Sequence, residues 1–142
     1  STASPESSSI TPEQFGAKGD GIADDLRALQ AAMQQASASG RSLELTAGAV
    51  YRFSSCLGLP SGLTIRGNGA VLLSDIQYPD LREDRVAVEL MKDSDDDRAH
   101  DVRLENVTFR AADSCQANYM LRVMRARNVE FVGCTFDCEH NE

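Results

Sequence analysis

The sequence predicts an all-β fold, a parallel β-solenoid that begins with one short capping helix. Three observations predict it: a segment that recurs further along the chain, many short alternating strand-like runs, and one helical period near the N-terminus. In a solenoid each repeat stacks its apolar side on the next, so neighbouring repeats bury one continuous core. We expect the chain to contain only the first few rungs and then to be truncated, where a rung is one complete turn of the solenoid.

The repeat consists of two segments with the same pattern. RAHDVRLENVTFR starts at Arg98, and RARNVEFVGCTFD starts at Arg125, an offset of 27. Alternating apolar side chains in both copies are expected to point into one core. They are Val102, Leu104, Val107 and Phe109 in the first copy and Val129, Phe131, Cys134 and Phe136 in the second. Asn106 and Gly133 interrupt the strands and suit the left-handed backbone of a sharp bend.

The outward positions of the repeat predict favourable neighbours on stacked strands, Arg103 beside Glu130 and Arg110 beside Asp137. An antiparallel β-sandwich is the competing architecture. It would need hairpin signals such as Asn-Gly or Asp-Gly between the alternating runs, and it would not need the repeat. The repeat therefore favours the solenoid.

The helix is predicted over about residues 24–38. Its apolar stripe recurs at three- and four-residue steps and consists of Leu26, Leu29, Met33 and Ala36. Asp24 can cap its start, and Gly40 suits the left-handed residue that ends a helix. We expect a flexible leader or linker over residues 1–10, an N-terminal cap over residues 11–40, and the first rungs over residues 41–142, continuing beyond the chain.

The composition argues against several classes of partner. The net charge of -8 and the pI of about 4.7 repel phosphate backbones and anionic lipids, so we expect no nucleic-acid partner. No apolar run is long enough to span a bilayer, so we expect no membrane partner either.

The segment FGAKGDGIADDLRALQAAMQQASASG, residues 15–40, is followed by strand-like runs and resembles the opening of the pectate lyase superfamily of right-handed parallel β-helices. This superfamily includes polygalacturonase-like hydrolases, alginate epimerases and bacteriophage tailspike depolymerases. The resemblance covers about residues 11–73, with Leu26 and Thr46 standing where Thr and Pro are common. It implies that the helix covers the N-terminal end of the solenoid, whose exposed strand edges would invite aggregation. FGAKGDG is then a turn and not a phosphate loop, because no Lys-Ser or Lys-Thr follows its last Gly.

The resemblance implies a polysaccharide-processing protein, and we expect a tailspike-type depolymerase that acts as a glycoside hydrolase or a polysaccharide lyase. Such a protein would lie in a virion tail or be secreted, form a homotrimer, bind polysaccharide and join a virion anchoring component. We expect this segment to cap and nucleate the solenoid without catalytic residues, since the hydrolase motifs of the superfamily are not recognisable after Gly40. The alternative is a non-enzymatic structural or adhesive solenoid module.

Three groups of side chains are the candidate site residues. Directly after the last strand, the catalytic candidates are Asp137, Glu139 and His140. The candidates for contact with an acidic sugar are Arg122, Arg125 and Arg127, which stacked ion pairing with neighbouring rungs explains as well.

The third group lies in an acidic inserted loop. VELM at residues 88–91 aligns with LRVM at residues 121–124 at an offset of 33, so KDSDDD at residues 92–97 is predicted to be an insertion. Its carboxylates could hold calcium, or the loop could simply be hydrated. The calcium candidates are Asp93, Asp95 and Asp97. We expect no other cofactor.

The four cysteines do not form a zinc pattern. Cys134 is expected to be a reduced core residue, because it lies on the inward side of the repeat. Cys115 and Cys138 lie one rung apart, which leaves a disulfide between them open. Because the last apolar side chains would face an open end, we expect a fragment of a larger protein.

Overall fold

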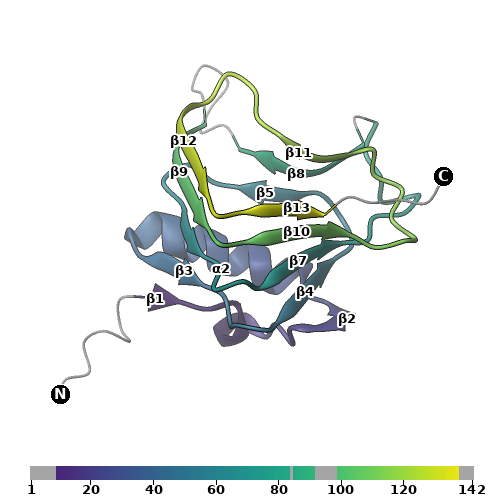
Figure 1. Cartoon of the computed structure of the whole chain (residues 1–142), viewed down its shortest axis with the longest axis horizontal. Helices are drawn as coiled ribbons and strands as arrows, with labels where there is room; N and C mark the ends of the chain where they lie inside the picture. Colours follow the sequence, from purple (N-terminus) through teal and green to yellow (C-terminus); the bar gives the residue numbers. More distant parts are fainter. Residues whose placement is uncertain (1–8, 84, 92–98, 138–142) are drawn as a thin grey trace.

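The computed structural model describes residues 9–83, 85–91 and 99–137, and it shows a right-handed parallel β-solenoid with one α-helix (Figure 1). Three parallel sheets line its sides. Sheet A contains β1 (Ser9–Ile10), β3 (Ser42–Glu44), β6 (Thr64–Arg66), β9 (His100–Glu105) and β12 (Arg127–Val132). Sheet B contains β2 (Asp20–Asp24), β4 (Val50–Phe53), β7 (Val71–Ser74), β10 (Thr108–Ala111) and β13 (Thr135–Asp137). Sheet C contains β5 (Leu57–Leu59), β8 (Val86–Leu90) and β11 (Tyr119–Arg122).

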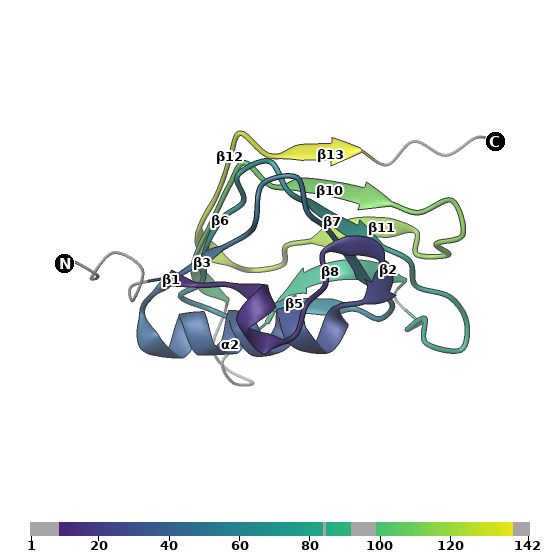
Figure 2. The same ribbon diagram turned by 90° about the horizontal axis from the view of Figure 1, so that it is seen from below.

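The chain visits the sheets in the order A, B, C in each complete rung. After β1, the 3-10 helix η1 (Pro12–Phe15) leads to β2, and α2 (Leu26–Ser39) then stands where later rungs have a sheet C strand. Figure 2 shows α2 beside β5, the first strand of that sheet. The helix thus completes the first rung.

The strand register confirms the predicted repeat. Leu104 pairs with Phe131 and Phe109 pairs with Phe136, both at the predicted offset of 27. The rings of Phe109 and Phe136 are stacked, with centroids 4.9 Å apart and planes 8° from parallel. In sheet C, Val88 pairs with Leu121 at the predicted offset of 33.

Earlier rungs have other lengths. Ile65 pairs with Leu43 at an offset of 22 and with Leu104 at an offset of 39. The inward-facing positions stay in register, because the extra residues are accommodated in the connections between sheets. The period of 27 therefore describes the last rungs only.

The bends between sheets A and B have the predicted backbone. Asn106 has a φ of 55° and Gly133 has a φ of 66°, both left-handed, and Asn68 at the equivalent bend has a φ of 53°. A Cβ at Gly133 would collide with the side-chain oxygen of Asn106. Glycine at this position therefore lets the Asn106 side chain approach the bend of the next rung closely.

The predicted apolar stripe of the helix is confirmed, but the helix starts two residues later than predicted. Leu29, Met33 and Ala36 are buried, and Leu26 packs partly against the core. The helix begins at Leu26, because Asp24 is still part of β2 and Asp25 is the N-cap residue. Gly40 ends the helix with a left-handed φ of 71°, as predicted.

The first rung begins before the predicted end of the leader at residue 10. Ser9 and Ile10 form β1 and pair with Ser42 and Leu43, and Ile10 lies in the core. The predicted leader is therefore at least two residues too long, and residues 1–8 lie outside the described part. The sequence pattern also missed β2 and β5, which are short and contain glycine.

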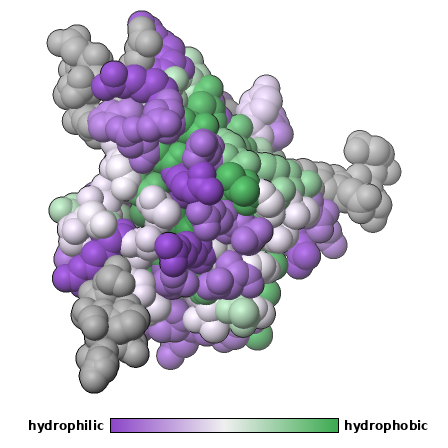
Figure 3. Space-filling view, turned by 60° about the vertical axis from the view of Figure 1, so that its left-hand side comes forward, coloured by the Kyte–Doolittle hydropathy of each residue, from purple (hydrophilic) through white to green (hydrophobic). Residues whose placement is uncertain are grey.

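The core runs along the solenoid axis and is less buried in the last described rung. The side chain of Phe109 is 0% exposed, whereas Phe136 above it is 46% exposed. Figure 3 shows hydrophobic residues gathered in one band between hydrophilic ones on the face that it presents. Among the described residues, no helix has the length and hydrophobicity needed to cross a bilayer.

Candidate functional site

The outer face of sheet C carries a compact charged cluster. Parallel pairing places Arg122 directly beside Glu89 on the neighbouring strand. The Glu89 carboxylate accepts hydrogen bonds from Arg122 at 2.7 Å and from Arg82 at 2.7 Å. Arg82 lies in the loop before β8, so this loop folds back against the sheet. We call these three residues the sheet C cluster.

The electrostatics of the sheet C cluster determine its protonation. The hydrogen bond from Arg82 lowers the pKa of Glu89, burial opposes this effect, and the bond from Arg122 lowers the pKa further. The carboxylate is consequently ionised at neutral pH and cannot supply a proton as a general acid would. Its role in this arrangement is to position two guanidinium groups on the outer face.

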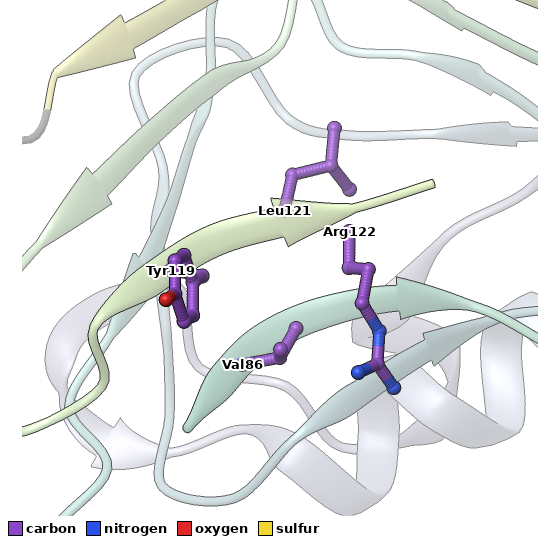
Figure 4. Close-up of a pocket in the computed structure, with 4 residues that line it drawn as sticks. All are labelled: Val86, Tyr119, Leu121 and Arg122. Carbon is purple, nitrogen blue, oxygen red and sulfur yellow. The ribbon is translucent and has the colours of Figure 1, made fainter. Parts of the chain in front are cut away.

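A small pocket of about 270 Å³ lies next to the sheet C cluster and is lined by Val86, Tyr119, Leu121 and Arg122 (Figure 4). In Figure 4, Leu121 and Arg122 project to opposite sides of β11. Among the described residues that line it, three are apolar or aromatic and Arg122 contributes a charge. A ligand in this pocket would meet one cation beside an aromatic ring.

The three predicted arginines do not form one surface. Arg122 belongs to the sheet C cluster, which agrees with the ion-pairing interpretation. Arg125 lies in the connection after β11 with a left-handed φ of 53°, and Arg127 begins β12 in sheet A. The structure therefore brings only Arg122 to the candidate face.

Asp137 is held by the rung below it. Its carboxylate accepts a hydrogen bond from Arg110 at 3.2 Å, as the repeat predicted. Arg103 likewise pairs with Glu130 across the same two rungs. The other catalytic candidates, Glu139 and His140, lie outside the described residues.

The calcium candidates Asp93, Asp95 and Asp97 also lie outside the described residues. Within the part that the structure describes, no group of three or more His, Cys, Asp and Glu side chains is placed to hold a metal ion. Cys134 is a free thiol packed partly against the core, and Cys115 is also free. Cys138, the other half of the disulfide left open by the sequence, is outside the described range.

The FGAKGDG segment forms a turn, as predicted. The buried carboxylate of Asp25 accepts hydrogen bonds from the backbone N–H groups of Lys18 and Gly19, both at 3.0 Å. These N–H groups are of the kind that a phosphate loop would direct at its ligand. Because Asp25 occupies them, the motif holds the cap together.

A polar cluster on the loops between sheets B and C was missed by the sequence pattern. The Asp75 carboxylate accepts hydrogen bonds from Ser114 at 2.7 Å, from Gln77 at 3.1 Å and from Arg52 at 3.1 Å. Burial raises the pKa of Asp75, but these three bonds outweigh it and the pKa is lowered. Next to it, Tyr78 is 82% exposed. In the sequence, the long interval between the runs that form β7 and β8 was the feature that could have indicated this polar cluster.

The family comparison agrees with this geometry. Residues 11–79 match the model described as rhamnogalacturonase A/epimerase, pectate lyase-like. Residues 11–79 are thus similar to the opening of a pectate lyase-like β-helix. The matched segment contains α2 and strands of all three sheets, from β2 to β7.

The chain is also similar to a curated protein of a bacteriophage. It is 45% identical over 60 residues to "Depolymerase 1, capsule K30/K69-specific" of Klebsiella phage K5-2, and the match covers 42% of this chain. The same match covers 7% of the relative, so the chain spans a small part of that protein.

Solved structures share the fold at low sequence identity. PfbA, a surface adhesin of Streptococcus pneumoniae, gives a TM-score of 0.75 at 18% identity, with 90% of this chain and 33% of that chain covered. ORF18 of Geobacillus virus E2 gives a TM-score of 0.73 at 20% identity, covering 92% of this chain and 26% of that one. At this level of identity, the likeness concerns the β-helix fold alone.

Proposed function

We propose that this chain is the N-terminal part of a polysaccharide-processing β-helix protein, a phage tailspike-type depolymerase that acts as a glycoside hydrolase or a polysaccharide lyase. In this proposal the segment caps and nucleates the solenoid and carries no catalytic residues. The observation that carries the proposal is the 45% identity over 60 residues to the capsule-specific phage depolymerase.

The helix geometry supports the capping role. The side-chain amide of Gln30 donates to the carbonyl of Gly58 at 2.6 Å and accepts from its N–H at 3.1 Å. Gly58 lies in β5, the first strand of sheet C, whose edge would otherwise be open. The hydroxyl of Ser37 donates to the carbonyl of Ser61, just after that strand. α2 therefore satisfies backbone groups as a strand would.

Three described carboxylates are unsuited to the role of a general acid. A general acid works best with a pKa raised towards neutrality. The pKa values of Glu89, Asp75 and Asp101 are instead lowered, by hydrogen bonds from Arg82, Ser114 and Asn128 respectively. These residues are suited to holding structure and binding ligands.

The proposal extends to assembly and location. We propose a homotrimer that binds polysaccharide, lies in a virion tail or is secreted, and joins an anchoring component of the virion. The relation to a phage depolymerase supports this placement. Sedimentation velocity of the complete gene product tests the oligomeric state, and a monomer at micromolar concentration would contradict the trimer.

A cleavage assay tests the activity. The 142-residue chain and the complete gene product are each incubated with purified Klebsiella capsular polysaccharides of types K30 and K69 and with a panel of other capsular types. New reducing ends without unsaturated uronates indicate hydrolysis, and new unsaturated uronates indicate a lyase. We expect cleavage by the complete product alone. Cleavage by the short chain would overturn catalytic silence, and no cleavage by the complete product would overturn the enzyme proposal.

A non-enzymatic structural or adhesive module is the second candidate, since the surface adhesin PfbA has the same fold. A complete gene product that binds a polysaccharide in gel-retardation experiments but never shortens it would identify this function instead.

A further inference from the structure

Two connections between sheets B and C are long loops. The last two A-to-B connections span only residues 106–107 and residues 133–134. The last two B-to-C connections span residues 75–85 and 112–118, whereas the first spans residues 54–56. Insertions in solenoids accumulate on one side, which is often the binding side. We therefore expect a ligand surface on this side of the molecule.

The two B-to-C loops are fixed to each other. The backbone N–H of Tyr78 donates to the side-chain oxygen of Gln116 at 2.7 Å, and the N–H of Gln116 donates to the carbonyl of Ile76 at 2.7 Å. Ile76 is buried in the core. The backbone at Tyr78 is consequently held against the neighbouring loop, so the position of this backbone does not need to order when a ligand arrives.

The Tyr78 ring remains 82% exposed on this fixed loop. The residue before it, Gln77, bonds to the Asp75 carboxylate, which also accepts from Ser114 on the second loop. Farther along the same loop, Arg82 reaches Glu89 on the outer face of sheet C. The loop that carries Tyr78 thus runs from the Asp75 polar cluster to the sheet C cluster.

This combination fits one ligand chemistry. An aromatic ring presents an apolar face and a polar hydroxyl, which complement the C–H face and the hydroxyl groups of a pyranose ring. Neighbouring amide and hydroxyl groups supply directional hydrogen bonds. A peptide or lipid ligand would need a larger apolar patch than a single ring.

We propose that the loops 75–80 and 112–118 form a carbohydrate subsite in which the Tyr78 ring stacks on a hexopyranose of a polysaccharide and Gln77 bonds its hydroxyl groups. This inference rests on the proposed function and adds a location for glycan contact. Arg82 and Arg122 border the subsite on the sheet C side and would favour an acidic sugar in the adjoining position.

Affinity electrophoresis tests the subsite. The complete gene product migrates through gels that contain the capsular polysaccharides of the cleavage assay. We expect Tyr78→Ala to weaken retardation about tenfold or more, because a central aromatic contact is lost. Tyr78→Phe keeps the ring and should bind nearly as the wild type. Ile22→Ala is the matched control, because Ile22 is 79% exposed on β2, outside both loops.

Fluorescence adds a readout that does not depend on activity. The chain has no tryptophan and three tyrosines, so stacking at Tyr78 should change the tyrosine emission of the 142-residue chain on titration with the retarding polysaccharide. Retardation that is equal for wild type and Tyr78→Ala would overturn the subsite and leave the proposed function standing. If no polysaccharide in the panel retards the complete gene product or is cleaved by it, both proposals fail.

Discussion

A buried tyrosine connects the cap to the second rung. The Tyr51 hydroxyl donates to Glu13 at 2.7 Å and accepts from the backbone N–H of Thr46 at 2.9 Å. Burial raises the pKa of Tyr51 to about 12, and the Glu13 carboxylate adds to the rise while the Thr46 bond opposes it. The neutral hydroxyl is thus part of the folded structure.

This pKa predicts a loss of stability in alkali. A pKa raised from 10.0 to about 12 on folding gives a contribution that is present below pH 10 and is lost as the pH rises towards 12. We expect Tyr51→Phe to cost about 1 kcal/mol at neutral pH, through the lost hydrogen bonds, and to reduce the alkaline slope of the unfolding free energy. Urea titrations at several pH values measure the unfolding free energy and its dependence on pH. Tyr78→Phe, at an exposed site, should keep the wild-type slope, and an unchanged slope in Tyr51→Phe would refute the assignment.

The stacked phenylalanines predict unequal costs of truncation. Phe109 is buried between neighbouring rungs, so Phe109→Ala should lower the unfolding free energy by about 3–5 kcal/mol. Phe136→Ala should cost less than half as much, since nearly half of that side chain already contacts solvent. Urea denaturation of both variants measures the difference. Equal costs would mean that the two rings do not differ in burial in solution.

Residue-level features were predictable where the repeat fixed them. Phe109 beside Phe136 and Arg110 beside Asp137 follow from one offset, because parallel strands in register place equivalent positions together. Asp75 and Tyr78 were not predictable in the same way. They lie in a loop without a repeating pattern, and their bonds to Ser114 and Gln116 depend on the path of a second loop.

At the scale of elements, α2 acts as a substitute for a strand. The helix and its apolar stripe were predictable from the spacing of Leu29, Met33 and Ala36. Its edge-covering contact was not, because Gln30 and Gly58 are 28 positions apart in segments with unrelated patterns. Similarly, Arg122 was predicted as a site residue, whereas its partner Glu89 followed only from the offset of 33 in sheet C.

The contact between α2 and β5 predicts a local effect of one substitution. Gln30→Ala leaves the N–H and the carbonyl of Gly58 without the amide that bonds them, which should cost about 1–3 kcal/mol. The Gly58 amide should exchange with solvent faster in hydrogen-exchange NMR. Gln35→Ala, at an exposed position of the same helix, serves as the control and should leave Gly58 unchanged. Unchanged exchange at Gly58 in Gln30→Ala would contradict the capping contact.

At the scale of the whole molecule, rungs of unequal length share one core. The successive offsets along sheet A are 33, 22, 39 and 27, and they change the connections between strands, whereas the inward side chains stay in register. These side chains are Ile10, Leu43, Ile65, Leu104 and Phe131. The fold class was predictable because stacking requires only one apolar face per strand. The lengths of the rungs that precede the 27-residue repeat in the chain were not predictable, since insertions in loops leave the apolar face of each strand intact.

Nearest-neighbour stacking predicts that damage spreads only locally along the solenoid. Because each rung contacts mainly the rungs above and below it, Phe109→Ala should accelerate amide exchange in β7, β10 and β13, which flank the lost ring. Leu29→Ala should instead accelerate exchange around α2, β3 and β5 at the other end. Hydrogen exchange followed by mass spectrometry measures both patterns, with the exposed Asp113→Ala as control. If each substitution accelerated exchange equally in all rungs, the solenoid would open as one cooperative unit, and the local model would be wrong.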